Sequence, residues 1–295
     1  MDVLVVILNY NTRELLRDCL SSLHDQQGIN FVTAVVDNAS TDNSVGMVVE
    51  EFPEVQVYPL KRNNGFSAGN NVAMRKYGFP YRGEARYVLL LNPDTVVPPN
   101  ALTDLVRYAD ANVQVGVLGP KLILEDGSLD KACRRSFPTP EISFYHMSGL
   151  SKIFSKSPRF ARYNMTYLPE DIETEVDSVV GACMLVRSAA IHRAGLLDER
   201  FFMYGEDLDW CLRVKEQGFQ VIYYPAVTVH HIKRAASRKS PKAQFEFTRA
   251  QWLFYQKHYR AKTSKLIHWL IVAGLSIKGG RTLLREMLAQ KVSSQ

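Results

Sequence analysis

Three carboxylates lie close together in the stretch FFMYGEDLDWCLR (201–213), where Glu206, Asp207 and Asp209 follow an aromatic run. Carboxylates this close disfavour joint ionisation, so a general base among them would have a raised pKa. The same acids would stabilise the first turn of a helix that begins after Gly205, because they complement the positive end of its dipole. The motif alone is compatible with both interpretations.

A second candidate is Asp94 in LLLNPDTVV (89–97), where it follows a buried apolar run and the rigid Pro93. A hard divalent cation takes oxygen ligands and completes its shell from substrate phosphates and water, so one such carboxylate can anchor it. The alternative is a simple turn, which Asn-Pro-Asp also favours.

Familiar phosphate-binding signatures are missing from the sequence. There is no G-x-x-x-x-G-K-[ST], and NNGFSAGNN (63–71) does not match G-x-G-x-x-G. P-loop hydrolysis and standard dinucleotide binding are therefore disfavoured, and a bound nucleotide would have to be held in another way.

The elements that must position these residues alternate between strands and helices. Apolar, β-branched runs at 3–8, 31–36, 55–60 and 87–91 each lead into a polar stretch and then a helical pattern. This alternation predicts an α/β fold with a mostly parallel open sheet, whose ligands bind beyond the carboxyl ends of the strands. The polar residues that follow the strands should therefore gather on one rim: Asn9, Asn11, Asp37, Asn38, Asn64 and Asp94.

The rest of the chain is less regular. From 126 to 175 the pattern loosens into a segment rich in Ser, Pro, Tyr and Arg, where a second substrate might be recognised, and the last fifty or so residues are helical in pattern. We expect a catalytic domain at 1–240, divided into halves at 1–125 and 126–240, and a helical extension at 241–295. Four scattered cysteines and no signal peptide indicate reduced thiols in the cytosol.

The net charge of +6 hides an asymmetry between body and tail. From Lys233 onward the chain has 14 Lys and Arg against two Glu, whereas 22 basic and 28 acidic residues precede it. The apolar stretch at 266–277 is too short to span a bilayer, but it could lie on an anionic membrane surface with Trp269 at the interface. The alternatives are a solvated face, packing against the catalytic domain or a second subunit, and nucleic-acid binding.

Seven motifs in order resemble inverting glycosyltransferases of the GT-A fold, most closely the bacterial rhamnosyltransferase type. They are LNYN, VVDNASTDNS, NNGFSAGNN, LLLNPDTVV, GACMLVR, FFMYGEDLDWCLR and VTVHHIKRAAS, within roughly 1–240. The resemblance implies transfer of a sugar, rhamnose being one candidate, from a dTDP or UDP donor to a hydroxyl of a glycan or lipid-linked acceptor. It also implies a Mg²⁺ or Mn²⁺ cofactor.

The resemblance further implies roles for individual residues. Asp207 is expected to be the base, with Glu206 as its partner. The metal-binding carboxylate is Asp94, where the family's D-x-D motif has Asn92 at its first position; His230 is a further metal or diphosphate contact, with His231 as the rival. The expected donor-binding residues are Asn9, Asn11, Asp37, Asn38, Asn64, Gly65 and Asn71.

On the acceptor side we expect Asp209 and Arg213 to pair along the helix, and Trp210 to form either an apolar wall for a sugar or part of the core. The C-terminal helices could also form a homodimer.

A nucleotidyltransferase that makes sugar nucleotides is the first rival function, but NYNTREL lacks the glycines expected after its first strand. A non-catalytic binding protein or a nucleic-acid binder is the second.

Overall fold

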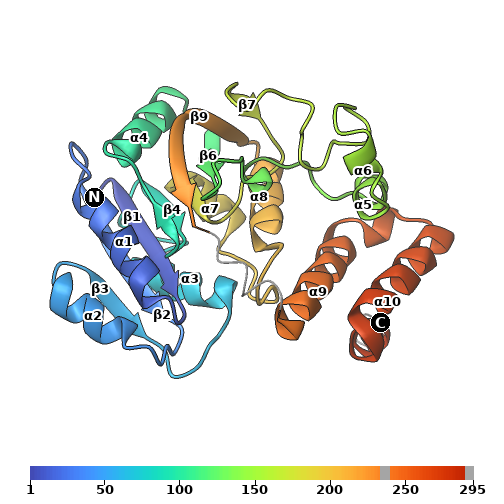
Figure 1. Ribbon diagram of the computed structural model, residues 1–295, viewed down its shortest axis with the longest axis horizontal. Coiled ribbons are helices and arrows are strands. Elements are labelled where there is room, and N and C mark those ends of the chain that lie inside the picture. Colours follow the sequence, from blue (N-terminus) through green and yellow to red (C-terminus); the bar gives the residue numbers. More distant parts are fainter. Residues whose placement is uncertain (233–239, 290–295) are drawn as a thin grey trace.

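A computed structural model describes residues 1–232 and 240–289. Its first half alternates strands and helices as the sequence predicts (Figure 1). These elements are β1 (Val3–Asn9), α1 (Arg13–His24), β2 (Phe31–Asp37), α2 (Ser44–Glu51), β3 (Gln56–Pro59), α3 (Phe66–Lys76) and β4 (Tyr87–Leu91). The four strands pair in parallel in the order β3, β2, β1, β4. β1 is a continuous apolar run because helices cover both faces of the sheet and leave its side chains buried.

The second half extends the same sheet and adds helices. Its elements are β5 (Thr95–Val96), α4 (Ala101–Ala111), β6 (Val115–Ile123), the 3₁₀ turn η1 (Lys131–Cys133), α5 (Pro140–Met147), α6 (Leu150–Ile153), β7 (Thr174–Glu175), β8 (Cys183–Arg187), α7 (Ser188–Ala194), α8 (Glu206–Glu216), β9 (Gln220–His231), α9 (Pro241–His258), η3 (Arg260–Lys262) and α10 (Lys265–Ala289). The sheet continues from β4 through β8, β6, β9 and β5, and β7 pairs with β9.

The direction of β8 makes the sheet mixed. β8 runs antiparallel to both β4 and β6, and β6 and β9 are parallel to each other. The first residues of β8 therefore lie at the same edge as the carboxyl ends of β1, β2, β4 and β9. This edge brings together the polar strand ends, as the sequence predicts.

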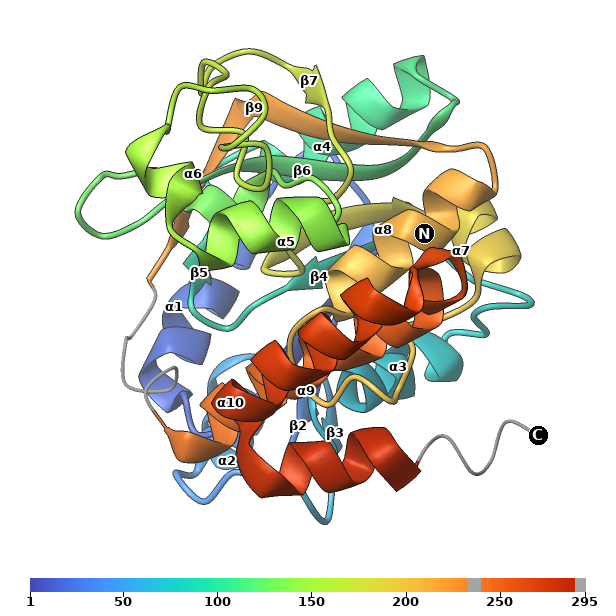
Figure 2. The same cartoon turned by 90° about the vertical axis from the view of Figure 1, so that its right-hand side faces the viewer.

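The C-terminal helices pack on α8 and on each other. Phe201, Leu208 and Leu212 form one apolar cluster with Ala250, Leu253 and Phe254 of α9, and α9 and α10 share a second cluster. Figure 2 shows α10 crossing in front of α9 and bending near its end, where Gly280 has a positive φ of 68°. The helical character expected after 241 is confirmed for the described part. Five basic residues of the tail lie outside the described residues: Lys233, Arg234, Arg238, Lys239 and Lys291.

Candidate active site

The carboxylate pair at the start of α8 is buried and held by an arginine. An Nη of Arg135 donates to Oδ2 of Asp207 at 2.7 Å, and both side chains are largely shielded from solvent. The backbone N–H of Gly181 also donates to Oδ2, and that of Leu208 donates to Oδ1. These donors fix the position of the Asp207 carboxylate at the edge of the sheet.

Arg135 is the main functional residue that sequence reasoning missed. Burial lowers the pKa of its guanidinium, but the Asp207 charge outweighs burial and holds that pKa above its usual value. Its Nε is buried with no hydrogen-bond partner among the described protein atoms. The only sequence signal was a pair of arginines, Arg134 and Arg135, in the segment expected to recognise a second substrate.

Glu206 differs from its neighbour Asp207. Burial, and then the charge of Asp207, raise the pKa of Glu206 from 4.5 to about 8. Its Oε2 is buried and has no partner among the described protein atoms. The raised pKa therefore belongs to Glu206, whereas the crowding of acids predicted it for the base.

The turn that starts α8 is docked on the loop before α3. Tyr204 and Gly205 both have positive φ, which reverses the chain immediately before Glu206. The backbone N–H of Phe66 donates to the carbonyl oxygen of Phe202 at 2.6 Å. Gly65 has a φ of 83°, and a Cβ there would overlap the same carbonyl oxygen. A glycine is therefore required where the loop expected to bind the donor meets the acidic loop.

The loops after β1 and β2 are joined by side-chain hydrogen bonds. The amide of Asn9 donates to Oδ2 of Asp37 at 2.8 Å and to Ser40, whose backbone N–H donates to Oδ1 of Asp37. Asn11 has a positive φ and accepts from the backbone of Thr41. Asn9 and Asp37 are buried, so in this structure they shape the loops that a nucleotide would contact.

Asn38 links the β2 end to the loop at 63–66. Its amide donates to the carbonyl of Gly65, and its Oδ1 accepts from the backbone N–H of Asn64.

Asn71, which was expected to bind the donor, is corrected to a buried structural residue. It lies inside α3, fully buried, where its amide bonds to the backbone of Leu197 and to Glu199. Asn71 therefore positions the segment that leads toward the acids and has no face available to a donor.

Asp94 meets His231 where β5 pairs with β9. Nε2 of His231 lies 3.2 Å from Oδ1 of Asp94, and Nδ1 lies 3.0 Å from Oδ2 of Asp130. The expected preference for His230 is corrected here, because His230 is exposed and lies on the other face of β9. Asn92 precedes this corner, with its backbone N–H bonded to Ala182 at the start of β8. Sequence reasoning did not identify Asp130.

The donor atoms around Asp94 fit a cation that is shared with a substrate. Asp94 supplies a partly exposed carboxylate and His231 an imidazole nitrogen, and a second carboxylate on the other nitrogen is the usual way to orient a ligating histidine. Among residues 1–232 and 240–289, no group of three or more His, Cys, Asp and Glu is placed to hold a metal ion alone. A nucleotide diphosphate would therefore have to complete the shell.

The remaining acidic residue of the motif is structural. Asp209 is fully buried and bonds to Arg213, Lys257 and His258, so the expected pairing along the helix is confirmed and extends to α9. Burial raises the pKa of Asp209, but these partners outweigh it and hold the pKa below its usual value. Trp210 is fully buried with its indole N–H bonded to Gly195, so it belongs to the core and forms no wall for a sugar.

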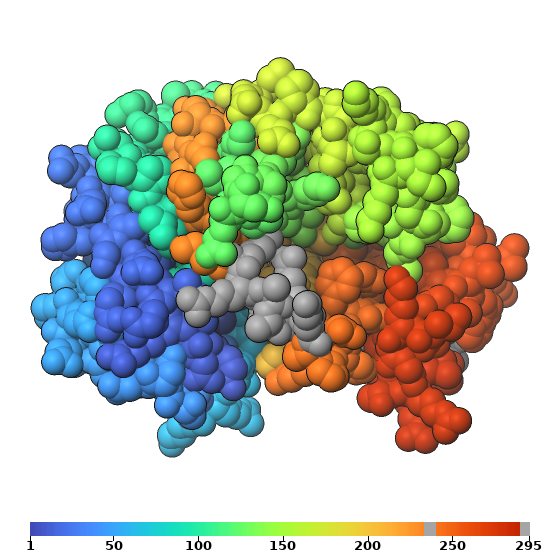
Figure 3. All heavy atoms as spheres, viewed as in Figure 1, coloured from blue at the N-terminus to red at the C-terminus, as the bar shows by residue number. Residues whose placement is uncertain are grey.

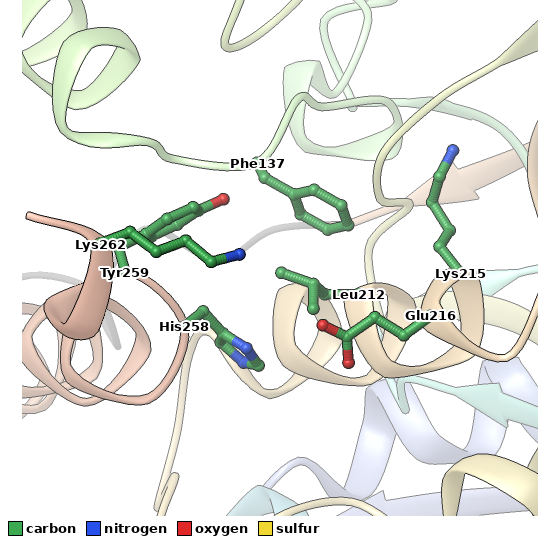
Figure 4. Close-up of a pocket in the computed structure, with 7 residues that line it drawn as sticks. All are labelled: Phe137, Leu212, Lys215, Glu216, His258, Tyr259 and Lys262. Atoms are coloured by element: carbon green, nitrogen blue, oxygen red, sulfur yellow. The ribbon is translucent and has the colours of Figure 1, made fainter.

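A cavity of about 300 Å³ lies beside α8, between the end of α9, η3 and the segment before α5 (Figure 4). Apolar and ionisable side chains line it: Phe137, Leu212, Lys215, Glu216, His258, Tyr259 and Lys262. In Figure 4 the Lys262 ammonium points into the cavity. Leu212, Lys215 and Glu216 belong to the carboxyl half of α8, whereas Asp207 lies in its first turn, so the cavity is further along the same helix that carries the acids.

The sequence matches a known protein family over most of its length. The family described as "Glycosyltransferase like family 2" matches residues 2–251. The N-acetylglucosaminyl-diphospho-decaprenol L-rhamnosyltransferase of Mycobacterium tuberculosis is 27% identical over 285 residues, which cover 94% of this chain and 92% of that protein. Rhamnosyltransferase WbbL of Escherichia coli K12 is 31% identical over 171 residues, which cover 57% of this chain and 60% of that protein.

Solved structures share the fold. TarS residues 1–349 of Staphylococcus aureus superpose with a TM-score of 0.59 at 17% identity, covering 100% of this chain and 73% of that one. The mannosyltransferase PcManGT of Pyrobaculum calidifontis, in complex with GDP-Man and Mn²⁺, gives 0.58 at 15% identity, covering 99% and 75%. These likenesses confirm the predicted GT-A fold.

Proposed function

Because the chain belongs to glycosyltransferase family 2, and is a sugar-transferring enzyme that acts on a glycan precursor, we propose that it is metal-dependent and inverts the transferred sugar. The observation that carries this proposal is the buried ion pair of Arg135 with Asp207. It provides one carboxylate, held by a cation, beside the loops at the carboxyl edge of the sheet. A single displacement needs one base, and that requirement matches this site.

In the proposed reaction, Asp207 accepts the proton of the acceptor hydroxyl as the oxygen attacks the anomeric carbon. Arg135 and the N–H of Gly181 hold the carboxylate in place before the reaction. Glu206, protonated at neutral pH, is able to donate a hydrogen bond to the acceptor or donor sugar. The bond from the anomeric carbon to the donor diphosphate breaks on the opposite face.

Asp94 and His231 would hold the cation, which would offset the negative charge that develops on the departing diphosphate. Asp130 would keep Nε2 of His231 directed toward Asp94. Asn38 and Gly65 would hold the loop that closes on the nucleotide. Burial of Asp37 and Asn9 supports a role in shaping this loop, with contact to the base or ribose made at its rim.

The names of the relatives guide the choice of substrates. Two are rhamnosyltransferases, and one of these acts on an N-acetylglucosaminyl-diphospho-decaprenol. We therefore propose a dTDP-linked rhamnose donor, with a UDP sugar as the alternative, and a lipid-linked diphosphate sugar as acceptor. The cavity beside α8 would receive part of that acceptor, because its aromatic walls suit a sugar face and Lys262 suits an anionic group.

A transfer assay tests this function. The protein is incubated with a synthetic N-acetylglucosaminyl-diphospho-lipid and either dTDP-rhamnose or a UDP sugar, with Mn²⁺, Mg²⁺ or a chelator. We expect a disaccharide product whose new linkage has the anomeric configuration opposite to the donor, as proton NMR would show, and no product in chelator. Retention of configuration, or full activity in chelator, would refute the inverting or the metal-dependent part separately.

A further inference from the structure

The first part of α10 exposes an apolar stripe on the side turned away from α9. Leu266, Trp269, Leu270 and Ile277 are 72%, 48%, 64% and 85% exposed, and their spacing places them on one helical face. The opposite face, with His268, Val272 and Leu275, is buried against α9. This part of α10 is therefore apolar on both sides, although only one side is covered by the described protein.

A second apolar patch lies on α5 and α6. Phe144, Met147, Ile153 and Phe154 are exposed there, at 62%, 41%, 74% and 48%. α5, α6 and α10 lie together at the right edge of the molecule in Figures 1 and 3, away from the blue N-terminal half. In Figure 2, which faces this edge, α5 and α6 lie directly above α10. The two patches thus belong to one surface, which we call the α5–α10 face.

Basic residues surround the apolar ones on the α5–α10 face. Burial lowers the pKa of His146 in α5, and the charges of Lys152 from α6 and Lys278 from α10 lower it further, so the two helices bring lysines close to the same place. Within the part of the chain that the structure describes, no ion pair is formed by the lysines and arginines of α6 and α10: Lys152, Lys265, Lys278, Arg281 and Arg285.

The acids of the face are already paired. Glu141 of α5 accepts from the hydroxyl of Tyr145 and lies near Arg159, and Glu286 of α10 accepts from Arg249. The unpaired charge of the α5–α10 face is therefore positive. Exposed aromatic and aliphatic side chains on the same helices as unpaired cations are the combination that binds anionic lipid surfaces.

We propose that the α5–α10 face docks on an anionic bilayer, with Trp269, Leu270, Ile153 and Phe154 entering the headgroup region. A second copy of the chain fits less well, because a two-fold pairing would set one positively charged face against another. No described helix is both long and apolar enough to cross a membrane, so the contact would be an interfacial one.

The position of the face relative to the acids gives this docking a purpose, which rests on the proposed function. α5 begins five residues after Arg135, and α10 begins three residues after Lys262, which lines the cavity beside α8. A lipid-linked acceptor in the bilayer would therefore lie next to the cavity beside α8 while its lipid stays in the membrane.

Flotation of the full-length protein with vesicles tests the proposal without any sugar transfer. Vesicles of equal parts phosphatidylglycerol and phosphatidylcholine should bind the protein at low salt, whereas pure phosphatidylcholine vesicles should bind it weakly, and binding should fall as salt is raised. Two apolar variants, Trp269→Ser/Leu270→Ser and Ile153→Ser/Phe154→Ser, should each weaken binding about tenfold or more, as should Lys152→Glu/Lys278→Glu.

Matched controls lie outside the face. Val49→Ser/Val113→Ser removes two side chains that are 63% and 73% exposed on α2 and after α4, and Lys76→Glu reverses one exposed charge on α3; neither should change binding. Absence of vesicle binding by the folded wild type would overturn the proposal. So would a concentration-dependent dimer in sedimentation velocity that the apolar variants abolish while vesicle binding persists. Vesicle binding without any transfer activity would refute only the proposed function.

Discussion

Arg135 and Asp207 form a buried ion pair between residues 72 positions apart, with an Nη of Arg135 2.7 Å from Oδ2 of Asp207. The arginine comes from the segment before α5, and the aspartate comes from the first turn of α8. The pair therefore fixes the acidic turn against the half of the molecule that we propose binds the acceptor. Removing either charge leaves the other one buried, which costs more free energy than the intact pair contributes.

We expect Asp207→Asn to lower turnover by about 10²-fold or more, the scale for loss of a general base. It should also lower the free energy of unfolding by about 3–5 kcal/mol, because the charge of Arg135 is left without its partner. A transfer assay and urea unfolding measure the two effects.

The double variant Arg135→Gln/Asp207→Asn separates stability from catalysis. Removing both charges should recover part of the lost stability and none of the lost turnover. If the single Asp207→Asn variant kept wild-type turnover, Asp207 would not be the base. If the double variant recovered turnover, the loss in Asp207→Asn would come from the unpaired charge of Arg135, and Asp207 would not be the base.

Glu206 should make the protein less stable as the pH rises. Its folded-state pKa of about 8 lies above the ordinary value of 4.5, so between these values the folded protein binds more protons than the unfolded chain. This stabilisation is complete below about pH 4.5 and is lost as the pH approaches and passes about 8.

Glu206→Gln cannot ionise, so its unfolding free energy should fall less over that window than that of the wild type. Denaturant unfolding at several pH values gives both curves. Parallel curves for the two proteins would show that Glu206 titrates normally.

The strand ends and the acid pair could be predicted from the sequence, whereas their partners could not. Asn9, Asp37 and Asp94 each follow a continuous apolar run, and parallel strands bring such ends to one edge. Arg135 and Asp130 carry no such signal. Their partners Asp207 and His231 are 72 and 101 residues away, and periodicity reports only on near neighbours in the sequence.

The choice between His230 and His231 shows a different limit. Alternation along a strand determines which of two neighbouring residues faces the site. In β9 this alternation is interrupted, because the pairing with β6 is irregular: Pro120 pairs with Tyr224, but the next residue, Lys121, pairs with Thr228. The three residues between these two partners on β9 change the phase of the alternation. No feature of HHI at the strand end reveals that shift.

These two histidines give a matched test of the metal site. Asp94→Ala and His231→Ala should each remove most of the stabilisation that Mn²⁺ with a nucleoside diphosphate confers on the wild type, about 2.7 kcal/mol at 100 times the dissociation constant. His230→Ala should leave it unchanged, because His230 is exposed on the other face of β9. Melting temperatures with and without Mn²⁺ measure this. The opposite order of the two histidine variants would restore the preference for His230.

The contact between the loop before α3 and the acidic loop depends on the absence of a side chain at Gly65. Gly65 and Gly127 have similar φ values, 83° and 77°, so alanine at either position meets the same backbone strain, about 1 kcal/mol. A Cβ at Gly65 would also overlap the carbonyl oxygen of Phe202, whereas a Cβ at Gly127 would meet open space.

We expect Gly65→Ala to lower the free energy of unfolding by about 2–4 kcal/mol and Gly127→Ala by about 1 kcal/mol. Because the overlap pushes apart the loop that Asn38 holds and the turn that carries Glu206, Gly65→Ala should also weaken donor binding, measured by calorimetry, while Gly127→Ala should not. Equal effects of the two substitutions on stability and on donor affinity would show that the two loops are not coupled through this contact.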